Sequence, residues 1–219
     1  MKNLIKKFGL SLLVIGFGIF LIFLIGNWQL EKFKKSLPQN LQKELKTFPI
    51  EEIQKKFFGE KTELKEWVSP DGKLKISFLS DWTEIEREAV ESLNQEIIQQ
   101  GAKILFFAQK LKIKGGAFAS LIIQELDKKE WTNLEKFIEE TKKEFKEKNG
   151  EIETARINSK EGIFEAKYKK EGQPELHFIE KILIGDDKIY SILFLTFDKD
   201  WQGFLEETNS ILNSAKILQ

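Results

Sequence analysis

The feature of this 219-residue chain that most constrains its fold is an apolar run near the N-terminus. From Phe8 to Ile25 there are eighteen residues without a charge. As a helix, such a run spans about 27 Å, close to the roughly 30 Å thickness of a bilayer's hydrocarbon core. We therefore expect a transmembrane helix over residues 8–28, within an N-terminal anchor of residues 1–30.

The flanks of this run predict how the anchor is retained and oriented. Residues 26–30 read GNWQL and contain no small-residue cleavage site of the kind that ends a signal peptide, so we expect the anchor to stay attached. Three lysines precede the run and three follow it closely. The free amino terminus adds one positive charge, which favours a cytoplasmic N-terminus and a C-terminal domain outside the cytoplasm. The predicted location is the cell membrane, with a single pass.

Two further regions follow the anchor. Residues 31–66 contain two prolines and are interpreted as a helical stalk with short helices at Gln39–Thr47 and Ile50–Phe58. Residues 67–219 are predicted to form one globular domain, which is large enough to bury its own core.

Composition excludes several classes of function. The 35 basic and 35 acidic residues cancel, and Arg87 and Arg156 are the only arginines, so we expect no nucleic-acid partner. The absence of cysteine excludes disulfides and thiolate metal ligands, and the single histidine, His177, excludes a pair of histidine ligands. We predict no catalytic residue, no cofactor and no metal site.

Alternating apolar and polar residues predict strands beyond residue 66. We expect a turn at Ser69–Gly72, a strand with Leu74, Ile76 and Phe78 on one face, and a hairpin turn at Gly115–Gly116. Further strands are expected over Lys103–Gln109, Ala117–Leu126, Glu151–Ile157, Gly162–Lys169, Glu175–Ile184 and Lys188–Phe197, and helices over 83–100, Thr132–Lys148 and from a cap at Asp200 onward. Successive hairpins predict an α+β class, with a largely antiparallel sheet of about six or seven strands and helices on its faces.

Several of these segments resemble the PsbP-like family over Trp67–Gln219. The resemblance implies an α-β-α sandwich in an extracytoplasmic, membrane-attached setting, and it implies no activity. The chain departs from the family pattern where Leu79 replaces a proline and Ala215 replaces a phenylalanine. The resemblance is carried by a central amphipathic helix, ISFLSDW at 76–82, paired strands around Ile163–Tyr168 and Lys188–Phe197, and ILNSAKI at 211–217.

Two polar patterns are candidate sites. Residues 198–203 begin like a calcium loop, with carboxylates at the first and third positions and a glycine at the sixth. The fifth position is Gln202, and the twelfth is Asn209 in place of the bidentate glutamate that such a loop needs. Helix capping by Asp200 is therefore the favoured interpretation. His177 shares a strand face with Glu175, a pair that could do acid/base work. Because no nucleophile or oxyanion motif lies nearby in the sequence, we interpret His177 as a strand-surface histidine.

The tryptophans give the best binding hypothesis. Trp82, Trp131 and Trp201 each lie at an element boundary and are interpreted as core residues, with an aromatic-lined ligand cleft that includes His177 as the functional alternative. The favoured function is a non-enzymatic envelope module that binds a protein or an amphiphilic ligand. The alternative is a hydrolase-like envelope enzyme that uses carboxylates from sites distant in sequence, which a cleft with two converging, pKa-shifted carboxylates would favour.

Overall fold

The computed structural model describes residues 63–98, 101–112, 117–127, 150–158, 160–169 and 174–218, with single positions at 139, 142, 143 and 146. Within this part, no helix is long and apolar enough to cross a bilayer. Several predicted features lie outside the described residues: the anchor, nearly all of the stalk, the Gly115–Gly116 turn, Trp131 and nearly all of the Thr132–Lys148 helix.

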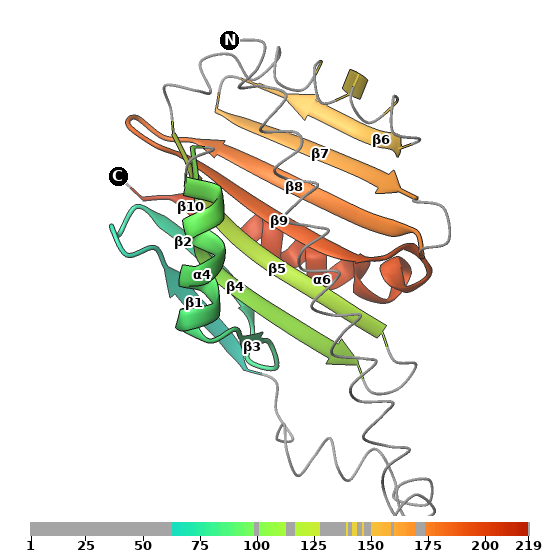
Figure 1. Ribbon diagram of the computed structural model, residues 1–219, viewed down its shortest axis with the longest axis horizontal. Helices are drawn as coiled ribbons and strands as arrows, with labels where there is room; N and C mark the ends of the chain where they lie inside the picture. Colours follow the sequence, from blue (N-terminus) through green and yellow to red (C-terminus); the bar gives the residue numbers. More distant parts are fainter. Residues whose placement is uncertain are drawn as a thin grey trace, which may run out of the picture.

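A seven-stranded antiparallel sheet forms the centre of the domain (Figure 1). Each neighbouring pair of strands is antiparallel, as successive hairpins predict. In spatial order the strands are β3 (Thr83–Glu84), β4 (Ala102–Lys112), β5 (Ala117–Leu126), β9 (Ile189–Phe197), β8 (Leu176–Ile184), β7 (Glu161–Tyr168) and β6 (Gly150–Ile157).

The predicted first strand belongs to a separate small sheet. β2 (Leu74–Leu79) lies between β1 (Leu64–Val68) and β10 (Lys216–Ile217), so this sheet joins the two ends of the described chain. β1 begins three residues before the predicted start of the domain at Trp67, and its residues pair with β2 in antiparallel register.

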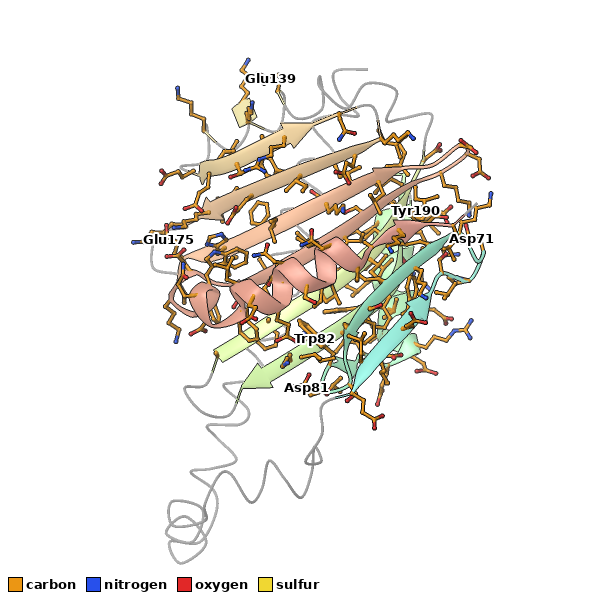
Figure 2. The ribbon with its side chains drawn as sticks, turned by 180° about the vertical axis from the view of Figure 1, so that it is seen from behind. Asp71, Asp81, Trp82, Glu139, Glu175 and Tyr190 are labelled. Carbon is orange, nitrogen blue, oxygen red and sulfur yellow. The ribbon has the colours of Figure 1, made fainter. Side chains whose placement is uncertain are left out.

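Helices lie on both faces of the large sheet. α4 (Arg87–Ile97) covers one face, and the short 3-10 helix η2 (Asp198–Asp200) leads into α6 (Trp201–Ser214), which covers the other (Figure 1). Seen from behind, α6 and the small sheet lie in front of the large sheet (Figure 2). The described domain is therefore an α+β sandwich, which confirms the predicted class.

The core on the α6 side follows directly from the sequence patterns. Alternate residues of β2, Leu74, Ile76 and Phe78, are at most 2% exposed. Five residues of α6 that share one helical stripe are buried: Trp201, Phe204, Thr208, Ile211 and Leu212. Each large apolar side chain buried here stabilises the fold by about 1.5–3 kcal/mol before entropy losses.

Two glycines predicted to mark turns, Gly72 and Gly101, are confirmed in that role. Gly72 has a φ of 73° and its N–H donates to the carbonyl of Ser69 over 2.8 Å, which closes the turn before β2. Gly101 has a φ of 78° and follows α4. Left-handed backbone of this kind carries little strain only for glycine, so both residues mark their turns in the sequence.

Two local predictions were wrong. The helix expected over 83–100 is preceded by strand β3, because residues 83–84 pair with β4. Asp200 occupies the position before α6, but its side chain makes no capping hydrogen bond, and its Oδ2 atom is buried without a partner. Its backbone is already helical, with φ −101° and ψ −10°, whereas a capping residue needs an extended backbone to reach the first free N–H groups.

Candidate metal centre

An irregularity in β6 creates the most chemically distinctive site of the domain. Ile152 pairs with Ala166 and Thr154 pairs with Glu165, so Glu153 is an extra residue in the β6–β7 ladder. A β-bulge of this kind turns the extra side chain away from its regular direction. Here the carboxylate of Glu153 comes to lie beside Glu165 and the imidazole of His177.

His177 is fully buried, at 0% exposed, and both its ring nitrogens face carboxylates. Nδ1 lies 3.0 Å from Oδ1 of Asp198. Nε2 lies 2.9 Å from Oε1 of Glu165 and 3.7 Å from Oε2 of Glu153. A neutral imidazole has one N–H, so a proton donated to Asp198 leaves the Nε2 lone pair facing two carboxylates. A shared proton or a metal ion between these atoms would relieve this contact.

Lys167 supplies the other positive charge of the cluster. Its Nζ lies 2.7 Å from Oε1 of Glu153 and 3.1 Å from Oδ1 of Asp198. The hydrogen bonds to Glu153 and then to Asp198 raise the pKa of Lys167, which stays protonated. Burial raises the pKa of Asp198, but hydrogen bonds from His177 and Lys167 outweigh it and hold that pKa below its usual value.

The three atoms that face one another have the spacing of metal ligands. One donor atom each from Glu153, Glu165 and His177 lies within 4.8 Å of the others. Ligands of a tetrahedral ion with bonds of about 2.1 Å are roughly 3.4 Å apart, between the 2.9 and 3.7 Å measured from Nε2 to the two glutamates. A histidine that binds a metal ion through one ring nitrogen commonly donates its other ring N–H to a carboxylate, which orients the ring. Asp198, next to Nδ1 of His177, is in this position.

Two of the three predicted tryptophans, Trp82 and Trp201, lie within the described residues, and both are in the core. Trp201 stacks on His177, with ring centroids 3.8 Å apart and planes 14° apart. Trp82 lies further along the same core, where Phe194 contacts it at 5.9 Å and contacts Trp201 at 6.0 Å. Trp82 is 3% exposed and Trp201 6%, so the two residues fill the interior on either side of Phe194. Of the predicted cleft residues, His177 and Trp201 are brought together.

The interpretation of His177 as a strand-surface residue was wrong. The face is as predicted, because Ile179 shares the core on that side, but α6 and its leading turn cover the strand. The predicted pair with Glu175 is replaced by carboxylates from β6, β7 and η2, which the sequence places up to 24 residues away from His177. The signal available in the sequence was the Glu165-x-Lys167 alternation opposite His177 in the neighbouring strand.

Comparison with known proteins identifies the fold. No family description and no curated protein sequence matches this chain. Among solved structures, cyanobacterial PsbP (CyanoP) from Synechocystis has 12% identity and a TM-score of 0.50, over 72% of this chain and 94% of its own. The Ran-binding protein Mog1p of Saccharomyces cerevisiae also matches, with 8% identity and a TM-score of 0.46, over 72% of this chain and 96% of its own. LpqN, involved in cell envelope biogenesis of Mycobacterium tuberculosis, matches with 10% identity and a TM-score of 0.43, over 76% of this chain and 97% of its own.

The described domain is an antiparallel α+β sandwich with helices on both faces of its large sheet. It has the PsbP-like fold, as the likeness to CyanoP shows and as the sequence resemblance predicted. At 12% identity the likeness defines the fold alone, so the chemistry of this chain has to be argued from its own residues.

Proposed function

We propose that this chain is a membrane-anchored, non-enzymatic binding module whose domain binds a divalent cation through Glu153, Glu165 and His177. The main support is the environment of the buried His177 ring. Its Nε2 atom faces two carboxylate oxygens, and its Nδ1 atom is in hydrogen-bond contact with Asp198. Imidazole together with carboxylates suits Zn²⁺ or Mn²⁺.

The charges of the cluster support a divalent ion in particular. Glu153, Glu165 and Asp198 carry three negative charges and Lys167 carries one positive charge, which leaves two negative charges around a neutral imidazole. One divalent cation balances this remainder, whereas a proton on His177 balances half of it. Uncompensated charge is costly at a site with a buried imidazole, so the cation-bound state is favoured.

The enzyme alternative would need converging carboxylates with shifted pKa values in a cleft. Among the described carboxyl groups, Glu180 is the one with a raised pKa. Burial raises this pKa to about 7, and a hydrogen bond from Ser191 partly opposes the shift. Glu180 is 3% exposed inside the α4-side core, where it is closed to a substrate. This arrangement supports a binding module.

The cation proposal is tested by calorimetry and thermal unfolding of the full-length chain in lipid nanodiscs, titrated with MnCl₂ and with ZnCl₂. At a free ion concentration one hundred times Kd, binding stabilises by about 2.7 kcal/mol, which corresponds to roughly 5–10 °C in Tm. His177→Gln and Glu165→Gln should abolish the effect. Affinity should also fall as pH is lowered, because metal ligands must be deprotonated to bind the ion.

Glu175→Gln is the matched control, because Glu175 lies at the same end of β8 (Figure 2) and makes none of the contacts to His177. It should bind both ions as the unaltered chain does. No stabilisation by either ion at millimolar concentration, or equal stabilisation of the His177→Gln variant, would contradict the proposal.

The setting of the module is proposed from the anchor. The transmembrane helix predicted at residues 8–28 would hold the chain in the membrane, with the N-terminus in the cytoplasm and the domain in the cell envelope. Because the chain has no cysteine, Asn209→Cys introduces a single thiol at an exposed position of α6. In intact spheroplasts a membrane-impermeant maleimide should label this thiol. Labelling only after lysis would place the domain inside the cell.

A further inference from the structure

A groove runs along α6 on the side that faces the small sheet. Its volume is about 350 Å³, within the range of small-ligand and side-chain pockets. The α6 wall consists of residues spaced three and four apart, so one complete helical stripe faces the groove: Gly203, Glu206, Glu207, Ser210 and Ile211. The opposite wall comes from β1 and β2: Leu64, Ser77, Phe78 and Leu79.

We propose that this groove is a docking site for a basic segment of a partner protein, with apolar side chains seated between cationic ones. This interaction goes beyond the proposed cation binding, which uses none of the groove residues. The groove has an apolar floor of Phe78 and Ile211, which are 2% and 1% exposed, and Leu64 lies at its rim, 64% exposed.

The charge of the groove selects a basic occupant. α6 contains Glu206 and Glu207 and no lysine or arginine. Glu206 is exposed, and no cation within the described part of the chain forms an ion pair with it. Its charge is therefore available to an incoming lysine or arginine at the rim of the groove.

A second excess of negative charge lies beneath the groove. Lys110 is 7% exposed and is shared by Asp81, at 2.8 Å, and Glu207, at 2.7 Å. One ammonium between two carboxylates leaves one negative charge. Oδ1 of Asp81 is also buried without a hydrogen-bond partner, and Trp82 donates from Nε1 to Glu207 over 2.8 Å. The two labelled residues, Asp81 and Trp82, lie together beside the small sheet in Figure 2. The groove wall as a whole therefore attracts cations.

Gly203 shows that the groove has room for a side chain. Apart from its chain neighbours and the backbone of its own helix, no atom lies within 4 Å of a Cβ atom added at Gly203. A larger residue can therefore be placed there without a clash, and in a helix it replaces a residue of low helix propensity. Gly203→Phe is thus expected to fill the groove and leave the domain folded.

The proposal is tested with fluorescent twelve-residue peptides added to the full-length chain in nanodiscs of neutral lipid, with empty nanodiscs as background. A peptide that alternates Leu and Lys should bind, a Leu–Glu peptide should not, and a Ser–Lys peptide should bind at least tenfold more weakly. Gly203→Phe and Glu206→Lys should each weaken Leu–Lys binding at least tenfold. Asn209→Phe, on the same helix but outside the groove, should leave it unchanged.

The location is tested by disulfide trapping in the cysteine-free chain. A Leu–Lys peptide with one activated thiol should react at least tenfold faster with Ser210→Cys, inside the groove, than with Asn209→Cys. Equal trapping at both positions, or peptide affinity that Gly203→Phe leaves unchanged, would overturn the proposal. Self-association of the chain that Gly203→Phe abolishes would overturn it as well, because the occupant would then be a second copy.

Discussion

The two ends of the large sheet carry ionic clusters of opposite design. Asp71 and Tyr190 lie at one end and Glu175 at the other (Figure 2), with the His177 cluster at the end of β8 that Glu175 precedes. At the first end many donors converge on one carboxylate. At the second, three carboxylates share one imidazole and one ammonium.

Asp71 illustrates the donor-rich design. Its carboxylate accepts from Ser69 over 2.6 Å, Tyr190 over 2.7 Å, the N–H of Lys73 over 3.2 Å and Lys188 at 2.9 Å. Burial raises the pKa of Asp71, but these hydrogen bonds outweigh it and hold that pKa well below its usual range. A carboxylate saturated with donors ties the turn of the small sheet to β9, and it has no vacant position for an ion.

The contrast suggests a rule for separating structural clusters from binding clusters in this fold. Where donors outnumber carboxylates, the cluster is complete within the chain. Where carboxylates outnumber donors, as around His177, a further cation completes the cluster. The predictions below test this rule at the two ends and at a carboxyl between them.

The largest effect is expected for Asp71→Ala. The variant leaves the buried Tyr190 hydroxyl without its acceptor and leaves Lys188 with Glu125 alone, which should reduce the free energy of unfolding by about 3 kcal/mol at neutral pH. Because the folded-state pKa is depressed, the difference from the unaltered chain should shrink as pH falls below about 4. Urea unfolding between pH 3 and 7 measures it, and a pH-independent difference would contradict the explanation.

Glu180 provides a carboxyl with a single donor, Ser191. Its folded-state pKa of about 7 is above the unfolded value of about 4.3, so the folded chain should lose stability as pH rises from about 4 to 7. Glu180→Gln removes this loss. At pH 4 the two chains should have similar free energies of unfolding, and at pH 8 the value for the variant should be higher by about 3–4 kcal/mol. Parallel stability curves for the two chains would refute the prediction.

A smaller change is expected for Lys167→Met. Removal of this ammonium leaves the three carboxylates around His177 with more uncompensated charge, so Mn²⁺ affinity should rise about tenfold, or about 1.4 kcal/mol. Without the ion, the variant should be less stable than the unaltered chain. Calorimetry with MnCl₂ decides the point, and a weaker affinity would show that Lys167 positions Glu153 for the ion.

The smallest effect is expected for Lys73→Ala. Lys73 forms an exposed ion pair with Asp187 at 2.6 Å, at the margin of the Asp71 cluster. Solvent screens such pairs, so the free energy of unfolding should not change measurably, although the pKa of Asp187, which the bond from Lys73 lowers, should rise. Carboxyl titration by NMR detects this rise, and a clear loss of stability would mean that the margin belongs to the structural cluster.

Much of the fold was predictable because its signals are local. β2, β5, β8 and β9 each carry their own apolar pattern, and α6 carries its stripe, so their types and approximate bounds follow from the sequence. The division into two sheets was not predictable in this way. β10 is two residues long and pairs with Lys75 and Leu74, about 140 positions earlier, and such pairing leaves no periodic trace.

The site was predictable only in part. The two-residue period placed His177 on the correct face of its strand, but periodicity does not reveal that Trp201 covers it. The carboxylates that surround it come from two neighbouring strands and a turn, and their approach depends on strand register. The extra residue at Glu153 breaks the period that sequence reasoning relies on.

Because Glu153 is an extra residue in β6, deletion of this one residue would remove a member of the His177 cluster and leave the strand intact. If Glu153 were deleted, Ile152 opposite Ala166 would be followed directly by Thr154 opposite Glu165, so the β6–β7 ladder would run without interruption. The rest of the strand would keep its partners and its buried face. A one-residue length difference in β6 would thus separate chains that have the proposed three-ligand cluster from chains that lack it, while both retain the same architecture.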